Sequence, residues 1–141
     1  MQNITNQSHS HADAHAVALE AEPEGLGQLL RVERPWGWYE NLSWVPGYKV
    51  KRIRVHPGQQ LSLQKHSQRG EHWVVVLGAA LVTVGDQVFS LAVGGHVDIA
   101  CEQVHRLANQ TDSPVEIIEV QFGAYLGEDD IVRLGDDYGR T

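Results

Sequence analysis

Residues 57–78 read PGQQLSLQKHSQRGEHWVVVLG and form the most informative part of the sequence. It opens with a Pro-Gly turn, continues through Gln64 and His66, and closes with an apolar run of strand length. Alternate residues of a strand project from the same face, so Gln64 and His66 point together. A tight turn over 67–70 would then bring the start of the apolar run beside His66.

The apolar run begins with two candidate ligands, Glu71 and His72. Neighbouring residues on a strand point to opposite faces, so only one of the two can face His66. Apolar side chains follow on both faces of the run, and periodicity leaves the choice open. We predict that Glu71 is the ligand, and we keep His72 as the alternative ligand and as a candidate catalytic base.

Short apolar runs separated by Gly, Pro, Asp and Asn continue on both sides of this stretch. Gly85-Asp86, between two such runs, predicts a β-hairpin. No connection is long enough for a crossover helix, so the pattern favours an antiparallel sandwich or barrel. We expect an all-β, jelly-roll-like barrel from about Arg34 to Gln121. The predicted strands are Trp36–Glu40, Tyr48–Val55, Gln60–Lys65, His72–Leu77, Ala80–Val84, Gln87–Leu91, His96–Ile99 and Val115–Gln121.

The two ends of the chain differ from this middle. Residues 1–28 are polar with little apolar periodicity, which is typical of a mobile tail, and we expect one domain over 29–141. The acids Glu128, Asp129 and Asp130 suit the first turn of a short C-terminal helix.

Composition excludes several classes of protein. The chain has 141 residues, which fits one domain, and its 11 basic against 18 acidic residues give a net charge of -7, which disfavours nucleic-acid binding. A single cysteine, Cys101, excludes an internal disulfide and a cysteine zinc site, and favours a reducing compartment. The sequence has neither an apolar stretch of about 18 residues nor a signal-peptide pattern. We therefore expect a cytoplasmic protein that binds neither nucleic acid nor a membrane.

The polar residues of the middle region suggest a metal site. A second cluster, residues 105–109, adds His105 to the donors already named. Two imidazoles, a carboxylate and an amide oxygen form a mixed set suited to zinc, manganese, iron, cobalt or nickel, with positions left open for water or substrate. The predicted metal ligands are Gln64, His66, Glu71 and His105.

The spacing of these donors resembles the two cupin motifs. The first is matched by Gly58-x5-Gln64-x-His66-x4-Glu71-x6-Gly78, with Gln64 in place of the motif's first His. The second is matched by Gly94-x10-His105-x3-Asn109, with Ala100 and Glu102 in place of the usual Pro and Gly.

Within the cupins, residues 33–140 are similar to the type II mannose-6-phosphate isomerase domain. In that family the domain forms the C-terminal part of bifunctional mannose-1-phosphate guanylyltransferase/mannose-6-phosphate isomerases; here we expect it as a stand-alone chain. The runs that carry the resemblance are Arg34-Pro35-Trp36-Gly37, Arg69-Gly70-Glu71-His72-Trp73, His105-Arg106-Leu107-Ala108-Asn109, Ile118-Glu119-Val120-Gln121 and Glu128-Asp129-Asp130-Ile131-Val132-Arg133.

The resemblance implies a metal-dependent isomerase that interconverts mannose 6-phosphate and fructose 6-phosphate through a cis-enediol, in polysaccharide biosynthesis. It implies one divalent metal ion, zinc before manganese, cobalt, nickel or iron, and a phosphorylated sugar as substrate. We also expect a homodimer, with the Trp-rich segment 36–44 covering a partner's sheet edge.

Residues around the metal ligands supply the remaining roles. Arg69, expected on the turn and partly exposed, is a candidate catalytic cation. Glu119 and Gln121 share one strand face, which would make them the base and a substrate-orienting residue if that face is the inner one. Arg133 and Arg140 are candidates for binding the phosphate, although both can instead pair with nearby aspartates at the surface.

Two other functions compete with the isomerase. One is a non-catalytic, metal-binding cupin that senses a sugar or nucleotide-sugar; the other is a different small-molecule cupin enzyme, such as an iron dioxygenase. Arg69 together with the C-terminal arginines favours the isomerase over the sensor. Gln64 in place of a first His disfavours the iron enzyme.

Overall fold

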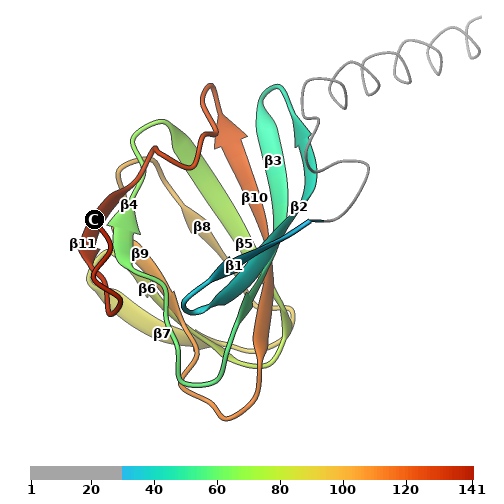
Figure 1. Cartoon of the computed structure of the whole chain (residues 1–141), viewed down its shortest axis with the longest axis vertical. Helices are drawn as coiled ribbons and strands as arrows, with labels where there is room; N and C mark the ends of the chain where they lie inside the picture. Colours follow the sequence, from blue (N-terminus) through green and yellow to red (C-terminus); the bar gives the residue numbers. More distant parts are fainter. Residues whose placement is uncertain (1–29) are drawn as a thin grey trace, which may run out of the picture.

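The computed structural model describes residues 30–141, which form two β-sheets that face each other (Figure 1). The strands are β1 (Arg31–Arg34), β2 (Gly37–Val45), β3 (Tyr48–Val55), β4 (Leu63–Lys65), β5 (Arg69–Leu77), β6 (Ala80–Val84), β7 (Gln87–Leu91), β8 (His96–Ile99), β9 (His105–Ala108), β10 (Val115–Gly123) and β11 (Val132–Gly135). Six strands form one sheet in the order β1-β2-β3-β10-β5-β8, and five form the other in the order β11-β4-β9-β6-β7. The paired strands run antiparallel, which confirms the predicted all-β barrel.

Most of the predicted strands are present in the structure, but the predicted C-terminal segment differs. The bounds of β3, β6, β7 and β8 agree with the prediction, and Gly85 forms the β6–β7 hairpin turn with a φ of 62°. The predicted C-terminal helix is wrong, because the acids after Gly127 lie in a loop that leads into β11. The predicted tail, residues 1–28, lies outside the described residues.

The inner face of the larger sheet changes from apolar to polar along the barrel. β10 lies between β3 and β5, so its inward side chains form cross-strand rows with both neighbours. From one end to the other, the rows are Val55 with Val115, Ile53 with Ile117 and Val75, Lys51 with Glu119 and Trp73, and Lys49 with Gln121 and Glu71. All of these side chains are buried, so one half of the barrel is an apolar core and the other half is a buried polar interior.

The Trp-rich segment lies inside the sheet. β2 pairs with β1 on one side and with β3 on the other, so both of its edges are paired within the chain. The dimer contact through this segment stays a prediction. Trp36 and Trp38 are each only 5% exposed within this chain. Arg31 stacks 3.8 Å from the Trp38 ring centroid and covers its outer side.

Glu102 adopts a backbone conformation that usually belongs to glycine. Its φ is 65°, and it stands where the cupin motif has Gly. Its N–H donates to the carbonyl oxygen of His66 at 2.7 Å. This hydrogen bond ties the turn of the second motif to the segment directly after β4, which carries His66.

Among residues 30–141, no helix is long and apolar enough to cross a membrane.

Candidate functional site

A cavity of about 600 Å³, including its open mouth, lies between the sheets in the polar half of the barrel. The side chains that line it are mainly ionisable or aromatic: Arg34, Trp36, Tyr39, Lys51, Gln64, His66, Arg69, Glu71, Trp73, His105, Glu119, Gln121, Glu128, Arg133 and Arg140.

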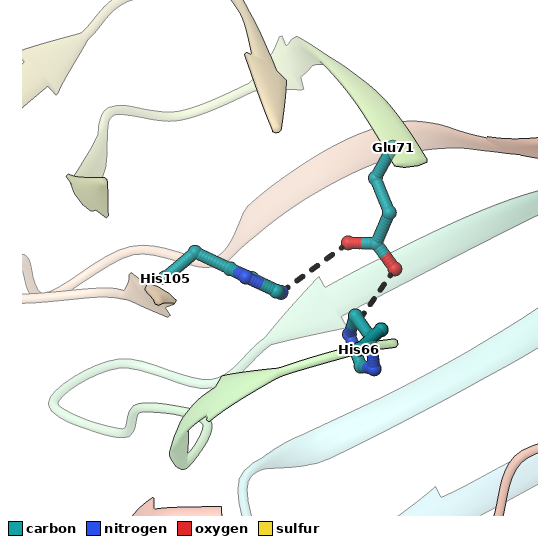
Figure 2. A group of neighbouring side chains, drawn as sticks. All are labelled: His66, Glu71 and His105. Carbon is teal, nitrogen blue, oxygen red and sulfur yellow. Dashed lines mark ion pairs between the residues drawn. The ribbon is translucent and has the colours of Figure 1, made fainter. Parts of the chain in front are cut away.

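Three of these side chains form a compact donor group. One ligand atom from each of His66, Glu71 and His105 lies within 4.8 Å of the others, and each side chain is at most 3% exposed. The two carboxylate oxygens of Glu71 face one imidazole each, at 3.4 Å from His66 Nε2 and 3.5 Å from His105 Nε2 (Figure 2). His66 directly follows β4, Glu71 lies in β5 and His105 in β9, so three separate segments position the donors.

The two imidazoles are held with Nε2 toward the cavity. Nδ1 of His66 bonds to the carbonyl oxygen of Asp130 at 2.6 Å, and Nδ1 of His105 bonds to that of Gln103 at 2.8 Å. A carbonyl only accepts, so Nδ1 carries the proton and Nε2 keeps its lone pair. This arrangement of a histidine with its second nitrogen anchored is usual for metal ligands.

The electrostatics keep the imidazoles neutral. Burial, assisted by the nearby Arg69 guanidinium, lowers the pKa of His66 to about 4. Burial also lowers the pKa of His105. Two neutral imidazoles beside a carboxylate fit a divalent transition metal.

Gln64, the fourth predicted ligand, lines the same cavity. It is the register partner of His105 on the neighbouring strand β9. Its amide nitrogen donates a hydrogen bond to the carbonyl of Ser62 at 3.4 Å, which leaves the amide oxygen available as a metal ligand. Its role as a ligand stays a prediction.

Glu71 and His72 lie on opposite faces of β5. Glu71 points inward and is 1% exposed, whereas His72 points to the outer face and bonds to Asp98 of β8. His72 does not line the cavity, so it is placed neither as a ligand nor as a catalytic base.

Arg69 is buried, contrary to the expectation of a partly exposed turn residue. It is the first residue of β5 and is 6% exposed. Its Nε donates to Glu71 at 2.9 Å, and its Nη2 lies 3.3 Å from Nε2 of His66. Its Nη1 is buried without a hydrogen-bond partner, which leaves one donor for a ligand in the cavity.

Glu119 and Gln121 both face inward. The indole Nε1 of Trp73 lies 3.2 Å from Glu71 and 3.3 Å from Glu119, so it links the two carboxyl groups. Gln121 donates to the second oxygen of Glu119 at 3.3 Å. Burial, then repulsion from Glu71, raises the pKa of Glu119 to about 8. A carboxyl with a pKa in this range exchanges protons near neutral pH.

Arg133 and Arg140 line the cavity together with Arg34, which the sequence analysis had not singled out. Arg140 forms a bidentate pair with Asp136, and Arg133 donates to the carbonyl of Thr141. Burial and the charges of Arg140 and Arg34 lower the pKa of Arg133, and its Nε is buried without a partner. Three guanidinium groups with one acidic partner form a cationic region that suits a phosphate.

Two lysines of β3, Lys49 and Lys51, are buried, and neither was among the predicted site residues. Lys49 is 0% exposed and donates to the carbonyl of Leu126 at 2.7 Å, and Lys51 is 3% exposed and bonds to Glu128. A signal was present, because Lys49 and Lys51 share one strand face with the apolar Ile53 and Val55. Lysines on a strand otherwise indicate a solvated face, so the signal was not used.

The chain matches a known family over most of its length. The family model described as "Mannose-6-phosphate isomerase C-terminal" matches residues 22–136.

The alginate biosynthesis protein AlgA of Pseudomonas aeruginosa is 54% identical over 132 residues, which covers 92% of this chain and 27% of that protein. The xanthan biosynthesis protein XanB of Xanthomonas campestris pv. campestris is 52% identical over 111 residues, covering 79% of this chain and 24% of that protein. The mannose-1-phosphate guanylyltransferase ManC of Salmonella typhimurium is 47% identical over 139 residues, which covers 92% of this chain and 29% of that protein. The chain thus spans about a quarter of the length of these curated relatives.

Solved structures share the fold at low sequence identity. Oxalate decarboxylase from Bacillus subtilis superposes with a TM-score of 0.69 at 15% identity, covering 78% of this chain and 31% of that chain. A protein with a double-stranded beta-helix domain from Klebsiella pneumoniae gives a TM-score of 0.64 at 21% identity, covering 74% and 90%. These likenesses support the cupin architecture alone.

Proposed function

Because the chain belongs to the family of mannose-6-phosphate isomerase C-terminal domains, we propose that it is itself a metal-dependent isomerase that interconverts mannose 6-phosphate and fructose 6-phosphate. The observation that carries this proposal is the meeting, in one cavity, of the His66–Glu71–His105 donor group with the raised-pKa carboxyl of Glu119. An aldose–ketose isomerase needs these two parts, a Lewis acid and a base.

The metal ion is held by His66, Glu71 and His105, with Gln64 as a fourth ligand. Zinc fits the donor set first, and manganese, cobalt, nickel and iron fit it as well. When bound, the ion supplies Lewis-acid stabilisation of negative charge on the substrate oxygens. Arg69 binds Glu71 through Nε and so fixes the carboxylate for this task.

Glu119 is the base that takes the proton from C2 of the aldose and returns it to C1. Its side chain is 4% exposed and lines the cavity, where it can reach the sugar. Trp73 and Gln121 hold one carboxyl oxygen each, which aims the group into the cavity. The free Nη1 of Arg69 donates a hydrogen bond to the oxygen on which negative charge develops.

The cationic region of Arg34, Arg133 and Arg140 binds the phosphate of the sugar. The planar guanidinium groups match phosphate oxygens in pairs. Asp136 orients Arg140, and the unpartnered Nε of Arg133 is available to the phosphate.

The experiment is a coupled assay for fructose 6-phosphate formed from mannose 6-phosphate, before and after treatment with a chelator and after re-addition of each metal. We expect activity that disappears with chelation and returns with zinc or another divalent ion. Glu119→Gln should keep the metal and lose turnover, whereas His72→Ala should keep both. Stoichiometric metal without turnover in the unmodified chain, under every divalent ion, would instead favour the sugar-sensing function.

A further inference from the structure

An aldose–ketose isomerisation through an enediol moves two protons. The first leaves C2 and arrives at C1, which is the task assigned to Glu119. The second leaves the hydroxyl on O2 and arrives at O1, so that one carbonyl becomes a hydroxyl and one hydroxyl becomes a carbonyl. The sum is balanced without any oxidant, reductant or leaving group, but the second proton also needs a carrier.

We propose that Lys51 is the carrier of this second proton: its ammonium group donates a proton to O1, and the resulting amine accepts the proton of O2. This inference rests on the proposed isomerase function. It assigns a step of that reaction to a residue outside the donor group and outside the phosphate-binding region.

The position of Lys51 fits this role. It is the register partner of Glu119 on the neighbouring strand, and both side chains point inward, so their Cβ atoms lie about 5 Å apart. Lys51 is 3% exposed and lines the cavity. Its ammonium lies 4.1 Å from the ring centroid of Tyr39, which holds the head group against one wall. The two groups that handle protons therefore project into the same part of the cavity.

The chemistry of the other ionisable groups in the described cavity excludes them from this step. Four of them are arginines, and a guanidinium does not release its proton in a protein. Two histidines and one carboxylate form the donor group, and Glu119 already carries the proton that moves from C2 to C1. Burial raises the pKa of the Tyr39 hydroxyl, which keeps its proton in place. Lys51 and its partner Glu128 are the groups of this cavity that are left.

Glu128 holds the ammonium group of Lys51 in place at the cavity. Its carboxylate bonds to Lys51 and lies 3.4 Å from Lys49, which is itself anchored to the carbonyl of Leu126. The ammonium of Lys51 is thus held by an acceptor on one side while it delivers a proton on the other. Lys49 keeps Glu128 in place during the moment when Lys51 is a neutral amine.

The test separates the two protons. Mannose 6-phosphate is incubated in D₂O with the metal-loaded protein, and two rates are followed by NMR: loss of the C2 hydrogen signal from mannose 6-phosphate, and formation of fructose 6-phosphate. The variants are Lys51→Met, Lys51→Arg and Glu119→Gln, with Lys65→Met as the matched control because Lys65 lies on the outer side and pairs with Glu102.

We expect Lys51→Met to lower fructose 6-phosphate formation by about 10²-fold while deuterium exchange at C2 continues. Lys51→Arg should behave in the same way, since it keeps the positive charge but cannot release a proton. Glu119→Gln should lose both rates, and Lys65→Met should lose neither.

Three outcomes would overturn the assignment. One is fructose 6-phosphate formation by Lys51→Arg within about threefold of the unmodified rate, which would show that charge alone is needed. Another is parallel loss of exchange and conversion in both Lys51 variants with metal retained, which would place Lys51 in the carbon step. The third is unchanged conversion in Lys51→Met. The proposed function fails in a different way, by the absence of both rates in the unmodified protein under every divalent metal.

Discussion

Nδ1 of His66 donates to the main-chain carbonyl of Asp130 across 2.6 Å, although 64 positions separate the two residues in the chain. The carboxylate of the same aspartate accepts hydrogen bonds from the main-chain N–H groups of Ser67 and Gln68 and from the Ser67 hydroxyl. Asp130 thus holds both the ring of a metal ligand and the turn that follows it.

The first prediction is that Asp130→Asn weakens metal binding by about 10-fold, the lower end of the range for losing an outer contact of a ligand. The main-chain carbonyl that orients His66 stays, but one of the two carboxylate oxygens that anchor the turn after His66 is replaced by a hydrogen-bond donor. The measurement is metal competition against a chelator, together with the visible spectrum of the cobalt-loaded protein. The control is Asp129→Asn, a neighbouring aspartate whose side chain bonds to Tyr125 instead. Equal affinities in the two variants would remove Asp130 from the metal site.

The second prediction concerns removal of the ligands. His66→Ala and His105→Ala should each lose stoichiometric metal, because each removes one of the three converging donors. His72→Ala should retain one metal ion per chain, since His72 points to the opposite face of β5. Elemental analysis of the purified variants decides between these results. Full metal content in both ligand variants would place the metal elsewhere.

The third prediction is a pH dependence that comes from Glu119. Its pKa in the metal-free protein is raised to about 8, above the value of 4.5 in an unfolded chain. The folded state then binds more protons than the unfolded state between these two values, so this group makes the free energy of unfolding fall as pH rises from about 4.5 to about 8. Urea titrations at several pH values within this window should show that the free energy of unfolding falls more steeply with pH in the unmodified protein than in Glu119→Gln. A divalent cation bound at Glu71 would offset the repulsion between the two carboxyl groups, which is the second cause of the raised pKa after burial, so the acidic limb of the activity profile of the loaded protein should lie below pH 8.

Arg69 carries the fourth prediction. Because it is buried against Glu71, Arg69→Ala should cost about 3–5 kcal/mol of stability in the metal-free protein, the range for one half of a buried ion pair. Arg69→Lys should recover part of the stability and still turn over at least about 10²-fold more slowly, since an ammonium cannot serve Glu71 and the substrate oxygen together. Thermal unfolding and steady-state kinetics on the same preparations test both parts.

The fifth prediction concerns Glu102 and its φ of 65°. Glu102→Gly should raise the free energy of unfolding by about 1 kcal/mol, because a side chain is costly in the left-handed region. Glu102→Gln keeps this backbone cost and removes only the exposed ion pair with Lys65, so it should change stability by less than about 0.5 kcal/mol. Urea midpoints measure both. A gain in Glu102→Gln as large as that in Glu102→Gly would make the ion pair, and not the backbone, the cause.

Sequence patterns predicted the barrel and the inward side of β4 because both depend on the two-residue period of a strand. Gln64 and His66 face the cavity as this period requires. The two-residue period could not predict whether Glu71 or His72 faces the cavity, because valines follow on both faces of β5 and make both faces apolar. The cross-strand register settled that choice, and register is a property of several strands together.

The residues that the sequence patterns misplaced were misplaced for different reasons. Arg69 was expected in an exposed turn, but the turn is shorter and β5 already begins at Arg69. β11 was mistaken for part of a helical segment, because its four residues are too few to display a period and acids precede them. Lys49 and Lys51 were passed over because burial of a lysine depends on partners such as Glu128 that are far away in the sequence.

The order of the rows across β3, β10 and β5 has a consequence for evolution and for engineering. The valine and isoleucine rows that hold the sheets together are separate from the rows that carry Lys49, Lys51, Glu119 and Glu71. Substitutions in the polar rows can therefore alter the reaction while the apolar rows continue to maintain the barrel. A mutant library confined to those polar positions would sample new chemistries on a scaffold whose robustness is encoded elsewhere along the same strands.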